Sequence, residues 1–327
     1  MSALPDPGPN PRLTVAVLSY DGRHLLETIL PSLAAQRFRD FEVVVVDNGS
    51  RDGTIEWLRE RWPTVAVHSI PDNVGVTPAL NVCARAGHGE LVGLFNNDLE
   101  LAPGCLGELV AALDAHPEAG WAGPKQMRFD DRRVLDGAGD IFTWRGGGHR
   151  RGHGELDRGQ YDAPSSIFGA CGGAAIYRRS ALLAVGPFDE DFHAFYEDID
   201  WDFRAQLLGF RCRYVPRAVV YHIGSATIGA GLTDFTRYHL WRNAIWVLAK
   251  NAPGRLLVRH LPELMLGQLL NLAVAARDRA LRIYLRAWRD ALAAMPRVRR
   301  QRRDIQRRRR VDERRIESVI GAPTGER

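Results

Sequence analysis

Between Leu13 and Asp98, four short apolar segments alternate with three segments of helical spacing, and this alternation constrains the fold more than any other feature. The apolar segments read LTVAVLSY (13–20), FEVVVVDNGS (41–50), VAVHSI (65–70) and ELVGLFNND (90–98). Helices are expected over 24–36, 51–62 and 77–86, the first bent or interrupted at Pro31 and the third with Pro78 in its first turn. Strands separated by helices of this length form βαβ units with a parallel sheet. Because continuous apolar strands are buried on both faces, the sequence predicts an α/β fold.

Polar side chains stand where two of these strands end. Asp47 and Asn48 follow the second apolar run, and Asn96, Asn97 and Asp98 follow the fourth. Asn and Asp are common turn formers, so a turn without function explains either group alone. In a parallel sheet, however, both groups lie at the carboxyl edge, where ligands bind. Together they favour a site for a nucleotide and a cation.

The net charge of +5 is unevenly distributed. Eleven arginines and three acidic residues lie between Arg297 and Arg315, which leaves a balance near −3 for the remainder. This pattern argues against nucleic-acid binding across the residues before Arg297, and it favours an anionic binding partner for the basic C-terminal segment. The four cysteines form no CxxC pair and indicate neither a zinc site nor a disulfide framework. Residues 1–12 are Pro-rich and polar, unlike a secretory signal, and are expected to be flexible.

Residues 136–162, rich in Gly, Arg and His, interrupt the periodic pattern. His149 and His153 have helical metal-ligand spacing, but three preceding glycines argue against a helix, so we predict a solvated or mobile loop without metal. A helix is expected over 197–210, followed by a bent strand or strand pair over 211–225.

From Thr233 the chain is expected to be helical and increasingly basic. The apolar segment 261–276 includes Pro262, Glu263, Gln268 and Asn271, which makes it too polar for a transmembrane helix of about 20 apolar residues. A helix over 281–292 would carry leucines on one face and arginines on another. Such a helix can lie on an anionic bilayer, or it can pack on the main domain or on a second subunit.

Five motifs, taken in order, resemble the inverting glycosyltransferases of family 2, and more narrowly their bacterial rhamnosyltransferase-like branch. They read VAVLSYDG, VVVVDNGSRDGT, DNVGVTPALN, LVGLFNNDLEL and CGGAAIYRRSALLAVGPFDEDFHAFYEDIDWDFRAQLLGFRCRYVPRAVVYH. Each is weak alone, but their order and spacing over about 13–250 are specific. The resemblance implies a GT-A fold, with a Rossmann-like, mostly parallel central sheet flanked by helices. A donor half would span about 13–125 and an acceptor half about 126–250, followed by a helical, Arg-rich extension over 251–327.

The resemblance also implies roles on the donor side. Asp47 matches a carboxylate that accepts a hydrogen bond from a nucleobase N–H, and Tyr20 would flank the ring. Gly75 belongs to a stretch beside the donor, where a glycine lets the backbone approach a ligand. The nucleotide-binding residues implied are Tyr20, Asp47, Asn48, Gly49, Ser50, Asn73, Gly75, Asn81 and Asn97.

A divalent cation, Mg²⁺ or Mn²⁺, is the cofactor that the resemblance implies. Asp98 matches the metal-binding end of the family's DxD motif, and His222 matches a later histidine that completes the site. Taken alone, His222 would more often be a core or surface histidine. Asn96 replaces the first Asp of the motif, and an amide is a weaker ligand than a carboxylate, so the metal affinity is left open.

Glu197 and Asp198 match the family's catalytic carboxylates, with Asp198 as the base that takes the proton of an acceptor hydroxyl. Glu197 would position the acceptor or share this role. Acidic residues also favour the first turn of a helix, which is the structural alternative. On the sugar side, Trp201 and Arg204 are expected to wall the acceptor pocket, and Gly172 with Gly173 to let a loop approach the donor sugar.

The sequence therefore predicts an inverting transferase that moves a sugar, such as L-rhamnose, from a dTDP- or UDP-sugar. The acceptor would be a hydroxyl of a glycan or a lipid-linked molecule in cell-envelope polysaccharide synthesis. A non-catalytic nucleotide-sugar or membrane-binding protein of the same fold is the alternative, and a nucleotidyltransferase is less favoured because its phosphate loop is missing. We expect a cytoplasmic protein. If the basic helices bind the cell membrane, the protein would be attached peripherally to its inner face. A homodimer is also compatible with the sequence.

Overall fold

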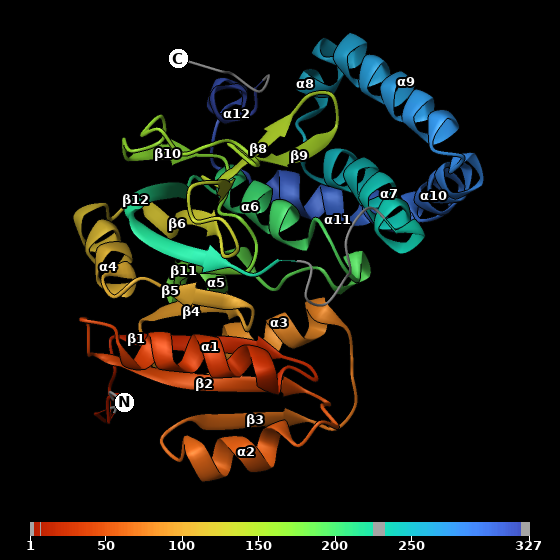
Figure 1. Cartoon of the computed structure of the whole chain (residues 1–327). Helices are drawn as coiled ribbons and strands as arrows, with labels where there is room; N and C mark the ends of the chain where they lie inside the picture. Colours follow the sequence, from red (N-terminus) through yellow and green to blue (C-terminus); the bar gives the residue numbers. More distant parts are fainter. Residues whose placement is uncertain (1–2, 7, 225–232, 322–327) are drawn as a thin grey trace.

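The computed structural model describes residues 3–6, 8–224 and 233–321, and its centre is one ten-stranded sheet (Figure 1). The main path of the sheet runs β10-β12-β6-β11-β4-β1-β2-β3, with β5 added beside β12 and β7 beside β6. Strands β4, β1, β2 and β3 are all parallel to one another, whereas β11 runs antiparallel to both of its neighbours. The sheet is thus parallel in its N-terminal half and mixed in its C-terminal half.

The parallel half confirms the predicted alternation of strands and helices. The strands are β1 (Leu13–Ser19), β2 (Phe41–Asn48), β3 (Ala66–Ile70) and β4 (Leu91–Asn96). The helices are α1 (Arg23–Ala34), α2 (Thr54–Arg61) and α3 (Val76–Arg85). Helix α1 continues through Pro31 to Ala34, so the proline does not end it.

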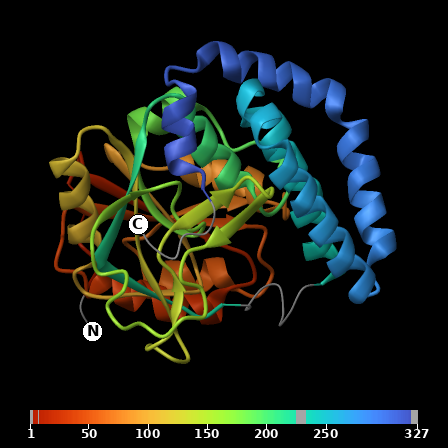
Figure 2. The same ribbon diagram turned by 90° about the horizontal axis from the view of Figure 1, so that it is seen from above.

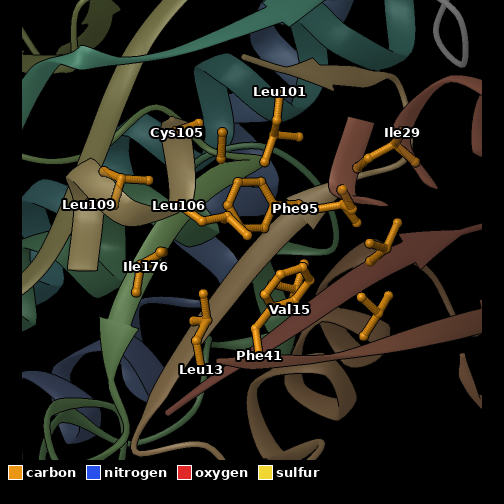
Figure 3. Close-up of a cluster of buried hydrophobic side chains, with 14 of the residues drawn as sticks. Leu13, Val15, Ile29, Phe41, Phe95, Leu101, Cys105, Leu106, Leu109 and Ile176 are labelled. Carbon is orange, nitrogen blue, oxygen red and sulfur yellow. The ribbon is translucent and has the colours of Figure 1, made fainter. Parts of the chain in front are cut away.

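Side chains of the parallel strands enter hydrophobic clusters on both faces of the sheet. Val15, Phe41 and Phe95 pack with Ile29 of α1 in one cluster (Figure 3). Neighbouring positions point to the opposite face, where Ala16, Val44, Val46, Val92 and Leu94 belong to a second cluster. Burial on both faces explains why these strands lack polar alternation.

The mixed half completes the sheet. Its strands are β5 (Leu99–Leu101), β6 (Ala119–Arg128), β7 (Leu135–Gly137), β10 (Ser165–Ile167), β11 (Ala174–Arg178) and β12 (Arg211–His222). Its helices are α4 (Cys105–Ala115), α5 (Arg179–Val185), the 3₁₀ turn η1 (Glu190–Phe192) and α6 (Glu197–Leu207). Strand β12 is one bent strand, with a register shift between Val215 and Val219 around Pro216.

The prediction of a solvated or mobile loop over 136–162 is wrong for residues 136–150, whereas residues 151–162 are mostly exposed and lie outside the named strands and helices. Strands β8 (Asp140–Thr143) and β9 (Gly147–Arg150) form a hairpin there, with Gly146 at φ +83° in its turn. Phe142 and Trp144 are buried and anchor the hairpin in a third hydrophobic cluster. The many glycines and charged residues of this segment are typical of a loop, and they outnumber the few apolar residues that bury the hairpin.

The C-terminal helices pack against the sheet domain and do not form a separate body. They are α7 (Asp234–Asn251), α8 (Gly254–Arg259), α9 (Leu261–Arg277), α10 (Leu281–Ala293), α11 (Met295–Arg308) and α12 (Glu313–Val319). Trp246, Val298 and Ile316 share the third cluster with Phe142 and Phe203. Viewed from above, α10 and α11 form an arc around one side of the molecule, and α9 runs inside this arc in that view (Figure 2). Residues on both sides of the predicted boundary at residue 250 therefore share one hydrophobic cluster.

The N-terminal segment is also partly anchored. Leu4 is buried in the first cluster, and Arg39 donates a hydrogen bond to the carbonyl oxygen of Ala3. Residues 1, 2 and 7 of this segment, 225–232 after β12, and 322–327 of the predicted extension lie outside the described residues.

A buried cation joins the C-terminal helices to the rest of the protein. The Nζ atom of Lys250 lies 2.6 Å from Asp189 and 2.9 Å from Asp200, which is fully buried. Lys250→Ala should lower the free energy of unfolding by about 3–5 kcal/mol, because Asp200 loses a cationic partner inside the protein. Urea unfolding followed by circular dichroism measures this change. The exposed Arg303→Ala on α11 is the control, expected within about 0.5 kcal/mol of the wild type. Equal changes in the two variants would contradict the role of Lys250.

Candidate active site

A cavity of about 800 Å³ opens where the carboxyl ends of the parallel strands meet the β8–β9 hairpin and α6. It contains residues from both predicted halves. Of the predicted site residues, those lining it are Tyr20, Asn48, Asn73, Gly75, Asn96, Asn97, Asp98, Gly172, Gly173, Glu197, Asp198 and His222. Most of the set that the sequence singled out is therefore brought together by the fold.

The end of β2 is tied to the loop that follows β3. Asn48 donates hydrogen bonds to Asn73 Oδ1 and Gly75 O, at 3.1 and 3.2 Å, and its own Oδ1 accepts from the backbone of Val74. Gly49 has φ +83°, and a Cβ there would meet the backbone of Asn73. The glycine therefore allows the two loops to approach closely.

Asp47 is fully buried beneath this loop pair and is not among the cavity-lining residues. Its Oδ2 accepts a hydrogen bond from the backbone of Ser50 at 3.1 Å, while its Oδ1 has no partner. Tyr20, in contrast, lines the cavity and is 42% exposed. A buried acceptor without a donor is costly, so Asp47 Oδ1 marks a position suited to an N–H donor.

Asn81 does not line the cavity. Its amide donates to Phe188 O and Glu190 Oε1 and accepts from Phe188 N, so its hydrogen bonds are used within the protein. The structure thus gives Asn81 the role of fixing the segment before α6, and its predicted contact with the nucleotide is not supported.

The polar end of β4 serves as both a turn and part of the site. Asn97 donates to Ser19 Oγ at 3.0 Å, and the turn at 97–98 leads into β5. Asp98 is 7% exposed, with Oδ2 3.2 Å from His222 Nε2 and Oδ1 without a partner. The turn interpretation of this strand end is confirmed, and the ligand-binding role of Asp98 stays a prediction.

His222 lies between two carboxylates. Its Nδ1 is 2.8 Å from Asp136 Oδ2, which also accepts from Arg150 Nη1 at 2.5 Å. Burial disfavours the imidazolium, but the hydrogen bonds with Asp136 and Asp98 outweigh it and raise the pKa of His222 to about 9. The arrangement is a chain of alternating charge, Arg150–Asp136–His222–Asp98, along the cavity wall.

The residues of this chain fit a divalent cation in part. Asp98 Oδ1 is a free oxygen, and Asp136 fixes the orientation of His222 in the way that carboxylates orient metal-bound histidines. Within residues 3–6, 8–224 and 233–321, no group of three or more His, Cys, Asp or Glu side chains is arranged to hold a metal ion. Mg²⁺ is commonly bound by one or two protein carboxylates together with substrate phosphates, so a cation at Asp98 and His222 would need the diphosphate of a bound donor to complete its ligands.

Helix α6 begins with the two predicted catalytic carboxylates. Burial, followed by the charge of Asp198, raises the pKa of Glu197 to about 8, and Glu197 Oε2 has no partner. Burial also raises the pKa of Asp198, whose Oδ1 accepts from the backbone of Ile199 at 2.8 Å. At neutral pH the neutral form of Glu197 is favoured, because ionisation of both neighbouring carboxylates would place two like charges in a buried site.

The backbone before α6 is unusual. His193, Phe195 and Tyr196 have φ values of 66°, 64° and 70°, in the left-handed region that non-glycine residues rarely adopt. Such conformations persist where surrounding contacts impose them, and they concentrate at functional sites. Here Asn243 of α7 donates hydrogen bonds to the carbonyl oxygens of Phe192, Ala194 and Phe195.

Two predicted pocket residues lie in the core instead. Trp201 is fully buried, donates to Gly186 O and packs edge-on against Trp121. Arg204 pairs with Asp200 and donates to the carbonyl oxygens of Val185 and Pro187. Neither lines the cavity, so the expectation that they wall the acceptor pocket is wrong. Both are on α6, but they project from the face that packs inward.

Sequence reasoning missed the carboxylates and the guanidinium that line the cavity from the β7–β9 segment: Asp136, Asp140 and Arg150. Burial and the nearby Asp198 raise the pKa of Asp140 to about 7. The sequence does contain a pattern that indicates these residues. Two aspartates flank the GAG segment immediately before the apolar IFTW, which is typical of polar residues at the start of a short buried strand.

Gly172 and Gly173 make room for the polar side chains of the site. A Cβ on Gly172 would collide with Asp198 Oδ2, and one on Gly173 with the amide of Asn96. The backbone at Gly172 and Gly173 therefore lies close to the side chains of Asp198 and Asn96 at the cavity wall. Its expected approach to the donor sugar stays a prediction.

Gly173→Ala is expected to lower transfer activity about tenfold or more, because the new methyl group displaces Asn96 from the cavity. Gly186→Ala is the matched control, since Gly186 has φ +91° against +93° for Gly173 but nothing within 4 Å of its Cβ position. Both variants carry similar backbone strain, and only the first has the collision. Steady-state transfer rates compare them, with thermal melting to confirm folding; equal rates would refute the steric argument.

Comparison with known proteins adds independent information. The model of glycosyl transferase family 2 matches residues 14–186. The N-acetylglucosaminyl-diphospho-decaprenol L-rhamnosyltransferase of Mycobacterium tuberculosis is 31% identical over 233 residues, covering 64% of this chain and 75% of that protein. An N-acetylglucosaminyltransferase of Sinorhizobium fredii is 29% identical and covers 71% of this chain and 57% of that protein.

Solved structures agree on the fold. The mannosyltransferase PcManGT from Pyrobaculum calidifontis, in complex with GDP-Man and Mn²⁺, has a TM-score of 0.54 at 23% identity and covers 94% of this chain and 87% of that one. GalNAc-T7 with UDP, GalNAc and Mn²⁺ has a TM-score of 0.60 at 17% identity, and the match spans 74% of this chain and 48% of that one. The GT-A fold is therefore confirmed. With a family match over more than half of its length, the chain belongs to glycosyl transferase family 2 and is a glycosyltransferase.

Proposed function

We propose that this enzyme transfers a sugar, with inversion, from a nucleoside diphosphate sugar to a hydroxyl group of a lipid-linked glycan. One observation carries the proposal: a single cavity contains the buried Asp198–Glu197 pair together with the Asp98–His222–Asp136 chain. The first would supply a proton acceptor, and the second would hold a divalent cation against the donor diphosphate. A transferase needs both in one cavity, since a nucleophile is activated while a leaving group departs.

In the proposed reaction, Asp198 accepts the proton of the acceptor hydroxyl as its oxygen attacks the anomeric carbon. The bond between that carbon and the diphosphate oxygen breaks, and the nucleoside diphosphate leaves with the electron pair. One displacement inverts the anomeric centre. Glu197, held neutral by burial and by Asp198, can donate a hydrogen bond to the acceptor.

On the donor side, we propose that Asp47 Oδ1 accepts from the nucleobase and that Tyr20 flanks the ring. Asn48, Gly49, Ser50, Asn73 and Gly75 shape the loops around it. Arg150 lines the cavity and pairs with Asp136, and we propose that its guanidinium adds positive charge beside the leaving diphosphate.

A divalent cation, Mg²⁺ or Mn²⁺, is proposed to bind Asp98 and His222 together with the donor diphosphate. When bound, it would neutralise charge that develops on the leaving diphosphate. Asn96 contributes at most an amide oxygen, which is a weaker ligand than a carboxylate.

The proposed sugar is L-rhamnose, delivered from dTDP or UDP. Support comes from the mycobacterial relative, whose name describes an L-rhamnosyltransferase acting on a lipid diphosphate. We propose that the acceptor belongs to cell-envelope polysaccharide synthesis and that the reaction takes place at the inner face of the cell membrane. No helix in the described part of the chain is long and apolar enough to cross a bilayer.

Calorimetric titration with dTDP, UDP and GDP, each with and without Mn²⁺, tests the proposal. We expect one nucleotide to bind tightly and only in the presence of the metal. Binding without a metal effect would remove the cation from the proposal, and binding of GDP alone would contradict the proposed donor. Absence of binding to all three would contradict the proposed donor site as a whole.

A further inference from the structure

Helix α9 contacts the rest of the protein along a narrow stripe. Gly267 lies directly against the carbonyl group of Arg145, so that a Cβ there would collide with it. Ala275 is fully buried, and Tyr284 of α10 donates a hydrogen bond to Gln268 O at 3.2 Å. In Figure 1, α9 lies at the outer edge of the molecule, away from the sheet. The remainder of its surface is open.

That open surface is mostly apolar. Val258 is 75% exposed and Leu269 is 59% exposed, values far from those of a packed core. We define the α9 face as the exposed apolar side chains of α8, α9 and α10: Val258, Leu261, Met265, Leu266, Leu269, Leu270, Leu272, Val274, Leu281, Leu285 and Leu292. Single exposed leucines are ordinary, but a gathering of this kind on adjacent helices marks an interaction site.

Arginines accompany the α9 face. Exposed guanidinium groups stand on the same three helices and their connections: Arg255, Arg259, Arg277, Arg279, Arg282, Arg286 and Arg289. Glu263 is the one exposed acidic residue there among residues 254–293, while Asp278 and Asp290 are less exposed and paired with arginines. On α10, Arg282 and Arg286 immediately follow the exposed Leu281 and Leu285, so a basic row borders an apolar row.

We propose that the α9 face docks the enzyme on an anionic lipid bilayer, with its leucines in the headgroup–acyl boundary and its arginines at the lipid phosphates. Exposed leucines bordered by arginines are the pattern of helices that lie in this interface. A second copy of the chain would bring like charges together, because each copy carries seven exposed arginines and one exposed acid over these helices. Charge therefore favours the bilayer.

This inference goes beyond the proposed function, because it concerns a surface on α8–α10 and requires neither the sugar nor the metal. It also commits the C-terminal helices to one of the two alternatives that the sequence left open. The leucines that carry it are mostly on α9, the segment that the sequence had excluded only as a transmembrane helix.

Co-sedimentation of the full chain with vesicles tests the proposal. We expect binding to phosphatidylcholine vesicles containing phosphatidylglycerol, little binding to pure phosphatidylcholine, and loss of binding as salt increases. The triple variant Leu266→Gln/Leu269→Gln/Leu270→Gln should weaken partitioning more than about tenfold, since three apolar side chains leave the interface. Leu183→Gln on α5 is the control: Leu183 is 78% exposed but lies outside the α9 face.

A wild-type chain that ignores both vesicle types, or a control that loses as much binding as the triple variant, would overturn the proposal. So would light scattering that shows a wild-type dimer and a monomeric triple variant, since the face would then bind a second copy. Nucleotide titration of the triple variant in solution should match the wild type. If neither the wild type nor the triple variant binds nucleotide, the proposed donor site is contradicted, whereas the vesicle-binding result still stands.

Discussion

Asp198→Asn is expected to lower the transfer rate about 10²–10⁴-fold while nucleotide affinity stays within about twofold of the wild type. This range is the usual contribution of a general base, and an amide cannot accept the acceptor's proton. Nucleotide affinity is preserved because Asp198 lies at the start of α6, apart from the loops after β2 and β3. Single-turnover rates with a saturating donor, together with calorimetric donor affinity, separate the two effects.

Glu197→Gln is the matched control for this prediction. Because burial and Asp198 raise the pKa of Glu197 to about 8, the wild-type side chain is mostly neutral at pH 7, and glutamine resembles that form. We expect the control to keep the rate within about tenfold of the wild type. A larger loss in Glu197→Gln than in Asp198→Asn would reassign the base to Glu197.

The pH profile should show the same assignment. Burial raises the pKa of Asp198 above its ordinary value, so the base becomes protonated at a higher pH than an exposed aspartate would. Transfer should therefore decline on the acid side as Asp198 takes up a proton, and Asp198→Asn should lose this acid limb.

Asp98→Ala is expected to abolish the stimulation of donor binding by Mn²⁺. The variant removes the carboxylate that faces His222 and leaves the cation with one protein ligand. Asp136→Asn, which changes only the group that orients His222, should reduce metal affinity about 10–100-fold and so less than Asp98→Ala. Manganese titrations in the presence of nucleotide measure both. An unchanged metal response in Asp98→Ala would remove this residue from the proposed metal site.

The sequence predicted the parallel half of the sheet well, because β1, β2 and β4 are buried on both faces and have long apolar runs, whereas β3 is a short and more exposed edge strand. It also predicted that Asp98, His222 and Asp198 share a site, although the ordered resemblance was needed to connect positions so far apart. It failed for Trp201 and Arg204. These residues follow Glu197 and Asp198 on α6, but helical geometry turns them inward to the core.

The hairpin over 140–150 could not be predicted from local propensity. Its glycines and charges are typical of a loop, whereas its stability comes from Phe142 and Trp144, which pack on helices more than 100 residues later in the chain. Asp136 and Arg150 were missed for the same reason. Their role depends on His222, a partner that only the folded sheet brings near.

Hydrogen bonds from α7 and α11 hold the segment before α6 in place, so substitutions in these two helices can alter the site. Asp189 and Asp191 are bound by Gln301 and Arg297 of α11, and the backbone of Phe192 is bound by Arg242 and Asn243 of α7. The family match stops at residue 186, before Glu197 and Asp198 and before all of these supports. The geometry of the segment before α6 therefore depends on contacts from α7 and α11. Substitutions in α11 that remove these contacts are expected to lower transfer activity, although they are distant in sequence from any motif.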